Sequence, residues 1–159
     1  MNVDTSEKRF ETDIETYFLN NGYTKIHHSL YDAEKMLFPD VLVSFIEKTQ
    51  PKAWARYQKL YGDSSKDKIT RRLFNAIAES NVLDVLKKGI KDMGIEIKLC
   101  YFKPSSNINI DLVSLYQQNI VGITRQFHYS LKNNNTIDTV LSFNGIPLFA
   151  FELKDQFKG

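Results

Sequence analysis

The chain has 159 residues, a formal net charge of +2, and 42% hydrophobic and 13% aromatic side chains, which is enough apolar material for one folded domain. A net charge this small gives no bulk electrostatic case for nucleic-acid binding, so any basic surface has to be local. The single cysteine, Cys100, excludes an internal disulfide framework and predicts a buried structural thiol. No run of about 18 apolar residues occurs and the N-terminus is polar, so we expect a cytoplasmic protein without a membrane span or signal peptide.

The first part of the chain predicts helices. Residues 6–20 carry Phe10, Ile14, Tyr17 and Phe18 at helical spacing and end before Asn21-Gly22. A helix is expected to open near Asp40 and to break before Pro51, and a second to run from there to Gly62. Two more are expected within 64–94, split near Ser80-Asn81 and closed by Gly89 or Gly94.

From residue 95 onwards the pattern predicts strands. The segment 95–102 alternates, 109–119 is typical of a short helix, and 120–130 and 136–143 are rich in β-branched and aromatic residues. Residues 131–135 are expected to form a turn or exposed loop, and 146–152 a last strand. We therefore predict one domain, 1–159, of the α/β (α+β) class, in which helices flank a mixed central β-sheet and the N-terminal part is rich in helices.

The last predicted strand ends in a charged pattern. Ile146 to Phe151 contain no polar side chain, and Glu152 and Lys154 follow, two residues apart and therefore on one face of a strand. Carboxylates that hold Mg²⁺, together with a lysine, are the groups used to hydrolyse phosphodiesters. Asp138, on the preceding strand, is the candidate for the second carboxylate.

The turn at Asn144-Gly145 decides whether these groups can meet. A two-residue turn pairs Asp138 with Phe151 and places the acid on the face away from Glu152. A three-residue turn with Gly145 in a G1 bulge pairs Asp138 with Ala150 and returns all three polar groups to one face. We therefore predict an odd-length turn.

A second Glu-x-Lys sequence provides an internal comparison. Glu96 and Lys98 lie in the alternating segment "IEIKL", so they can occupy a solvated face. Both faces of the final hairpin are apolar, so we expect a central strand pair covered on both sides, with Glu152 costly to bury there. Buried charges are paired or coordinate metals, and from the pattern alone a metal site and a structural ion pair remain equal alternatives.

Other chemically suggestive residues have simpler interpretations. The three histidines, His27, His28 and His128, are too few and too scattered for a zinc site and are assigned structural or surface roles. Trp54, with Tyr57 and Tyr61 at helical spacing, is predicted to pack against the sheet rather than to stack on bases. Basic pairs on predicted helices are expected to form solvated faces, with phosphate contact as the alternative; these are Arg71/Arg72 and Lys87/Lys88, with Lys91 and Lys98 nearby.

Several blocks resemble a known family. "ETDIETYFLNNGY", "GIKDMGIEIKLCYFKP", "NIVGITRQFHYS" and "IDTVLSFNGIPLFAFELK" together cover most of residues 11–154. They resemble the N-terminal endonuclease domain of the restriction (R, motor) subunit of type I restriction-modification enzymes, a branch of the PD-(D/E)xK nuclease superfamily with a restriction-endonuclease-like core. The last block is the most specific, because it holds the acid, the Asn-Gly-Ile-Pro turn and Glu-Leu-Lys in order.

The resemblance implies roles for individual residues. Asp138 and Glu152 would be the metal-binding and catalytic carboxylates, and Lys154 the catalytic lysine. The family's opening helix carries an acid that can approach the metals, and this acid falls on Glu11 or Glu15, which both flank the Ile14/Phe18 stripe. Glu15 is preferred, and a solvated helix carboxylate is the alternative for either residue. Arg125 and Gln126 match an Arg-Gln pair of the family, where contact with DNA or with the active site is possible, and a surface strand pair is the alternative.

The resemblance also implies a function. We expect a Mg²⁺-dependent type I site-specific deoxyribonuclease domain from a prokaryotic cytoplasm, which cuts double-stranded DNA after ATP-driven translocation. Modification and specificity subunits would be its partners. The chain has no Walker-type sequence, so ATP would act only through an absent motor region, and 1–159 is expected to be the N-terminal fragment of a longer chain. The alternative is a non-catalytic DNA-binding or subunit-docking module that retains the nuclease fold.

Overall fold

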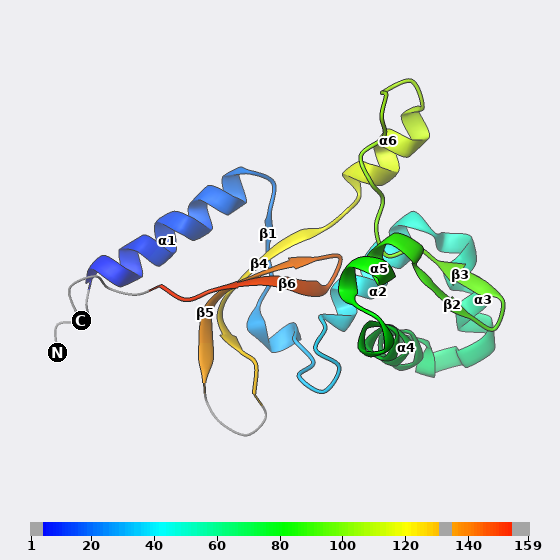
Figure 1. The fold of residues 1–159 in the computed structure, drawn as a ribbon, viewed down its shortest axis with the longest axis horizontal. Helices are drawn as coiled ribbons and strands as arrows, with labels where there is room; N and C mark the ends of the chain where they lie inside the picture. Colours follow the sequence, from blue (N-terminus) through cyan, green and yellow to red (C-terminus); the bar gives the residue numbers. More distant parts are fainter. Residues whose placement is uncertain (1–4, 131–134, 154–159) are drawn as a thin grey trace.

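The computed structural model describes residues 5–130 and 135–153, and these form the helices and strands shown in Figure 1. The α-helices are α1 (Thr5–Asn20), α2 (Pro39–Thr49), α3 (Pro51–Tyr61), α4 (Ser65–Glu79), α5 (Val82–Lys88) and α6 (Ile110–Gln117), with short 3₁₀ helices at His28–Leu30 and Gly62–Ser64. The strands are β1 (Thr24–Lys25), β2 (Ile90–Asp92), β3 (Ile95–Ile97), β4 (Val121–His128), β5 (Thr136–Phe143) and β6 (Ile146–Phe151).

The helices of the first part begin and end where the sequence predicts. Helices α2 and α3 both start at a proline, whose missing N–H and fixed φ suit the first turn. The side chain of Asn81 accepts a hydrogen bond from the Asp84 N–H at the start of α5, and Gly89 follows its last residue with a φ of 71°. Local capping signals therefore set these boundaries, and the predictions for this part are confirmed.

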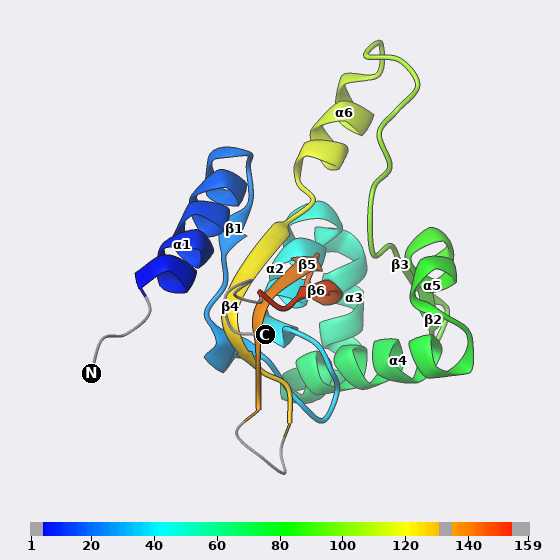
Figure 2. The same cartoon turned by 60° about the vertical axis from the view of Figure 1, so that its left-hand side comes forward.

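The main sheet is mixed and has the strand order β1-β4-β5-β6. β1 pairs with β4 in parallel, and the β4–β5 and β5–β6 pairs are antiparallel. Figures 1 and 2 show α1 alongside β1 and β4, whereas helices α2 to α5 gather at the other end of the molecule around the small β2–β3 sheet. This arrangement confirms the predicted α/β class with a mixed sheet and flanking helices.

The turn of the final hairpin differs from the prediction. Phe143 pairs with Ile146, so the turn has two residues, Asn144 and Gly145, and both have positive φ, 49° and 86°. The prediction of a three-residue turn is therefore wrong. Asp138 and Glu152 nevertheless reach one face, because the register shifts between Leu141 and Ser142 and leaves Leu148 as the extra residue of a β-bulge on β6.

Buried contacts explain why the turn is short. Asn144 is fully buried, and its Nδ2 donates to the Leu99 carbonyl at 2.8 Å while its Oδ1 accepts from the Ile120 N–H at 2.6 Å. The Phe38 N–H donates to the Gly145 carbonyl at 2.8 Å, and a Cβ on Gly145 would lie only 2.7 Å from the Phe38 carbonyl oxygen. The turn is thus fixed in the core, and the shift in register has to occur further along the strand.

Strand β6 is also less enclosed than predicted. It lies at the end of the sheet order, and no strand within the described part of the chain pairs with its outer edge. Phe149 and Phe151 are 63% and 42% exposed, so the expectation of a central pair covered on both sides is wrong. The apolar pattern on both faces reflects a half-covered edge strand rather than a buried central one.

The main core lies between the helices and the small sheet. It contains Phe45, Tyr57, Ile69 and Leu73, all fully buried, together with the inward-facing residues of β3. Cys100 is buried as predicted, and its thiol donates to the Leu86 carbonyl. Burial raises the pKa of this thiol, as expected of a structural cysteine. None of the helices in the described residues is long and apolar enough to cross a membrane.

Candidate functional site

The bulge places the two candidate carboxylates opposite each other. Beyond the bulge, Val140 pairs with Ala150 and Thr139 with Phe151, so continuing this register by one residue sets Asp138 opposite Glu152. Asp138 also accepts a hydrogen bond at Oδ2 from the Leu153 N–H at 2.6 Å, which confirms that the two strand ends lie together. The sequence therefore correctly predicted that Asp138 and Glu152 share one face of the hairpin, but through the wrong turn.

The environment of this pair is open. Asp138 is half-buried, Glu152 is exposed, and among the described residues no hydrogen bond or ion pair occupies the Glu152 carboxylate. Lys154, the predicted catalytic lysine, lies outside the described residues. Within residues 5–130 and 135–153, no group of three or more His, Cys, Asp or Glu side chains gathers closely enough to hold a metal.

Helix α1 contributes two acids to the neighbouring region. Glu11 and Glu15 are 8% and 7% exposed, so neither is the solvated helix carboxylate that residues of this type usually are. Glu15 lies 2.9 Å from Lys25 Nζ on β1 and 3.2 Å from Arg125 Nη1 on β4. Burial raises the pKa of Glu15, but the hydrogen bonds from Lys25 and Arg125 outweigh it, so that this pKa lies below its usual value.

Arg125 and Gln126 face this helix. The Arg125 guanidinium bonds to both Glu11 and Glu15, and the Gln126 Nε2 donates to Glu11 Oε1 at 3.2 Å. Burial lowers the pKa of Arg125, but its bonds to these two acids raise it above its usual value overall. The predicted DNA contact by this pair, and the predicted metal contact by Glu15, are not tested by these bonds and stay predictions.

One feature of this region gave no signal in the sequence. Gln126 has a φ of 49°, a left-handed conformation that is uncommon for a residue other than glycine, in the middle of β4. It lies where the β4–β5 ladder is interrupted, between Arg125, which pairs with Thr139, and Phe127, which pairs with Ile137. The position across the gap is that of Asp138.

The second Glu-x-Lys sequence lies on β3, as expected for a solvated pair. Ile95 and Ile97 are buried on either side of Glu96, which is exposed. Glu96 pairs across the small sheet with Lys91, and their side chains lie 2.6 Å apart. This carboxylate therefore has a positive partner directly opposite, unlike Glu152.

The histidines lie closer together than their positions in the chain suggested. The ring centroid of His28 lies 4.3 Å from that of His27 and 5.0 Å from that of His128, and both ring pairs are tilted. Their description as scattered is therefore wrong. They still do not form a metal-binding group with the other described residues. Burial, followed by the neighbouring histidines, lowers the pKa of His28.

The aromatic and basic residues behave as predicted. Tyr57 and Trp54 are buried, stacked 5.8 Å apart, and both Tyr57 and Tyr61 donate to Asp92 Oδ2 at the edge of the small sheet. Four of the basic residues named in the sequence analysis have a neighbouring acid or carbonyl; these pairs are Arg71 with Asp67, Arg72 with the Lys91 carbonyl, Lys88 with Asp84, and Lys91 with Glu96.

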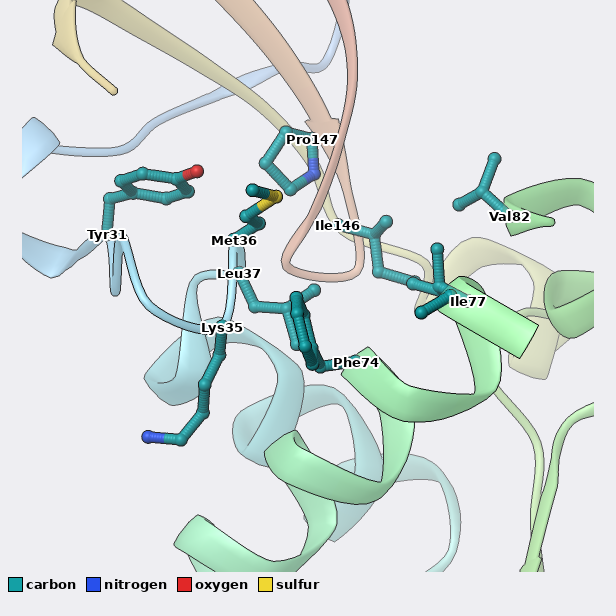
Figure 3. A pocket seen from close by; sticks show the side chains of 10 residues that line it. Tyr31, Lys35, Met36, Leu37, Phe74, Ile77, Val82, Ile146 and Pro147 are labelled. Atoms are coloured by element: carbon teal, nitrogen blue, oxygen red, sulfur yellow. The ribbon is translucent and has the colours of Figure 1, made fainter. Parts of the chain in front are cut away.

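A separate cavity of about 540 Å³ opens at the turn end of the final hairpin (Figure 3). Its walls are almost wholly apolar and come from the 31–37 loop, from Phe74 and Ile77 of α4, and from Ile146 and Pro147 of β6. Asp138 and Glu152 lie at the opposite end of the hairpin and do not line it. The cavity is therefore distinct from the carboxylate pair.

The chemistry of the carboxylate pair suits a hard cation. Like charges directly opposite each other on neighbouring strands destabilise a sheet unless something neutralises them. Mg²⁺ is commonly held by one or two carboxylates and completes its coordination with water and substrate phosphates. Asp138 and Glu152 supply this donor set, and the exposed side of Glu152 leaves room for such a substrate.

Comparison with known proteins identifies the family. No curated protein and no solved structure matches the chain. The family model described as "Type I restriction enzyme R protein N terminus" matches residues 5–159, which is nearly the whole chain. The chain therefore belongs to the family of type I restriction enzyme R protein N-terminal domains.

Proposed function

We propose that this chain is the Mg²⁺-dependent endonuclease domain of a type I restriction enzyme and that it hydrolyses phosphodiester bonds of double-stranded DNA. The observation that supports this proposal is the opposition of Asp138 and Glu152, created by the β6 bulge. If stability alone decided the residue opposite Glu152, a cationic side chain would be favoured there, as Lys91 of β2 is opposite Glu96. Family membership supplies the general nuclease role, and the carboxylate pair supplies a site for it.

Each of the two strands would provide one carboxylate ligand. Asp138 is fixed by the Leu153 N–H at Oδ2, so its second oxygen is the one available to a cation. Glu152, exposed at the end of β6, would provide the second ligand from the side that faces solvent. Mg²⁺ bound between them would polarise the phosphodiester and activate a water molecule for attack.

Lys154 completes the proposed site. It follows Glu152 by two residues, so an extended backbone would direct it to the same face. There its ammonium group would orient the attacking water or stabilise the charge that develops on the phosphoryl oxygens. DNA, and the modification and specificity subunits that complete a type I enzyme, are the corresponding proposed partners, and ATP would be used outside this chain.

The experiment is DNA cleavage and ATP hydrolysis by the complete restriction enzyme that contains this chain. Asp138→Ala and Lys154→Ala are each expected to lower cleavage by about 10²-fold or more while ATP hydrolysis stays at the wild-type rate. Lys98→Ala is the matched control, because Lys98 occupies the same place in the other Glu-x-Lys sequence. Cleavage that persists in both variants would contradict the proposal and support a docking module that only keeps the fold.

A further inference from the structure

The hydrogen bonds of Gln126 suggest a role that none of the sequence motifs assigns. Consecutive residues of a regular strand direct their side chains to opposite faces. Arg125 and Gln126 instead both bond to the carboxylate of Glu11, one to each oxygen. The left-handed φ of Gln126 accounts for this, because it turns the backbone and brings the amide round to the side of α1.

The position of this distortion is specific. The β4–β5 ladder is regular on both sides of Gln126 and is interrupted only at the place opposite Asp138. Glu15, by contrast, bonds to Arg125 and to Lys25, and Lys25 lies beside Ile123, further towards the other end of β4. Glu11 is therefore the α1 acid held at the level of Asp138.

A left-handed glutamine is unfavourable by itself, and such strain persists only where the surroundings impose it. Gln126 is exposed, so packing does not explain its conformation. Its amide is one of the groups that satisfy the buried Glu11 carboxylate and so connects the exposed end of the sheet to α1. Figures 1 and 2 show α1 alongside β4 at this end of the molecule.

We propose that Gln126 is a positioning residue for DNA cleavage: its strained conformation lets its amide fix Glu11, and with it α1, at the level of the Asp138–Glu152 pair. This inference rests on the proposed function. Gln126 acts through Glu11 and need not touch the reacting atoms. Catalytic groups lose efficiency when a neighbouring element moves by about 1 Å, so loss of this hydrogen bond should affect cleavage more than folding.

The test is Gln126→Gly in the complete restriction enzyme, because glycine accepts the left-handed conformation but lacks the amide. DNA cleavage is expected to fall by about 10- to 100-fold, while ATP hydrolysis and the unfolding temperature of the domain are retained. Met93→Gly is the matched control, since Met93 also has a positive φ, 46°, but lies exposed in the β2–β3 turn. It is expected to leave cleavage unchanged.

A conservative variant separates the effect of the side-chain amide from the effect of the backbone conformation. Gln126→Asn keeps a carboxamide and tolerates the left-handed conformation, so it is expected to recover part of the cleavage lost in Gln126→Gly. A cleavage rate of Gln126→Asn no higher than that of Gln126→Gly would overturn the proposal. So would a loss of cleavage accompanied by lost ATP hydrolysis or early unfolding, because Gln126 would then be structural.

Asp138→Ala in the same assay separates the two proposals. If Asp138→Ala abolishes cleavage and Gln126→Gly cleaves like the wild type, the positioning role fails and the proposed function stands. If Asp138→Ala cleaves like the wild type, the proposed function fails, and the role of Gln126 fails with it.

Discussion

The β2–β3 and β5–β6 hairpins are alike in construction and differ in what they bring together. Both close through a two-residue turn with positive φ at each position, Met93-Gly94 in one and Asn144-Gly145 in the other. Both carry Glu-x-Lys on or just after the second strand. The β2–β3 register is regular, whereas that of β5–β6 shifts by one residue at the bulge.

The residue opposite the glutamate is what distinguishes the two hairpins. Glu96 lies opposite Lys91 and forms an ion pair at 2.6 Å. Glu152 lies opposite Asp138, so two negatively charged carboxylates face each other and a cation can stabilise them. A Glu-x-Lys sequence is therefore informative only when the strand beside it is known.

Matched substitutions of Glu152 and Glu96 are expected to give the largest difference in DNA cleavage between the two hairpins. Glu152→Gln should lower DNA cleavage by the complete enzyme by about 10²- to 10³-fold, because it removes a charged ligand from the proposed site. Glu96→Gln should leave cleavage unchanged, since only the ion pair with Lys91 is lost. Equal rates for the two variants would remove the distinction between the hairpins.

Shifting the register beyond the bulge should have a similar effect without altering any charged residue. Insertion of one alanine between Leu148 and Phe149, with the bulge kept, would place Asp138 opposite Phe151 instead of Glu152. Cleavage is expected to fall below detection while ATP hydrolysis by the complete enzyme continues. Deletion of Leu148 is the control, because it removes only the extra residue and leaves Asp138 opposite Glu152. Cleavage by the insertion variant at the wild-type rate would show that the opposition of the carboxylates is not required.

The glycines of the two turns should differ in their effect on stability. Gly145→Ala is expected to cost about 2–4 kcal/mol, since the new Cβ adds backbone strain and lies 2.8 Å from the Leu42 nitrogen. Gly94→Ala, whose Cβ would meet nothing within 4 Å, should cost about 1 kcal/mol from positive φ alone. Denaturant unfolding of the two variants measures the difference, and equal losses would mean that the turn of β5–β6 is not fixed by its packing.

Opposed carboxylates should lower stability when no divalent cation is present. Asp138→Asn is expected to raise the free energy of unfolding in EDTA by about 0.5 kcal/mol, because it removes like-charge repulsion while the amide oxygen can still accept from the Leu153 N–H. Lys91→Glu should do the reverse in the other hairpin and lower stability, because it creates a like-charged pair with Glu96. A destabilised Asp138→Asn would indicate that Asp138 has a positive partner instead.

The smallest expected effect is the pH dependence of the Lys91–Glu96 pair. The hydrogen bond and charge of Lys91 hold the pKa of Glu96 below its usual value of 4.5. A lowered folded-state pKa stabilises the protein above the unfolded value and loses that contribution as the pH falls through the folded value. Wild type and Glu96→Gln should therefore differ in thermal unfolding at neutral pH and converge in acid; a constant difference would contradict this assignment.

Local signals predicted most of the fold. Amphipathic stripes, prolines at the first turn, and caps such as Asn81 and Gly89 depend on neighbours in sequence, and the helices they predict are present. The shared face of Asp138 and Glu152 was also predictable, because a strand that ends in a charged residue after six residues without a polar side chain, Ile146 to Phe151, is unusual. Only the predicted turn was wrong, because a bulge on β6 rather than a three-residue turn shifts the register.

The remaining features depend on contacts between distant parts of the chain. The two-residue turn is fixed by hydrogen bonds from Asn144 to Leu99 and Ile120, which no local pattern contains. The edge position of β6 follows from the strand order, and the left-handed Gln126 bonds to Glu11, which lies more than a hundred residues earlier in the chain. These are tertiary effects that override local propensity.

The most direct test is a crystal structure of the complete R subunit soaked with Mn²⁺, examined for anomalous density at the end of the β5–β6 hairpin. The opposition of Asp138 and Glu152 predicts a peak between their carboxylates at a metal–oxygen distance of about 2.1 Å. The contradicting result would be no peak, with the Lys154 ammonium group between the two carboxylates instead. That arrangement would make the constellation a structural ion pair of the kind that Lys91 forms with Glu96.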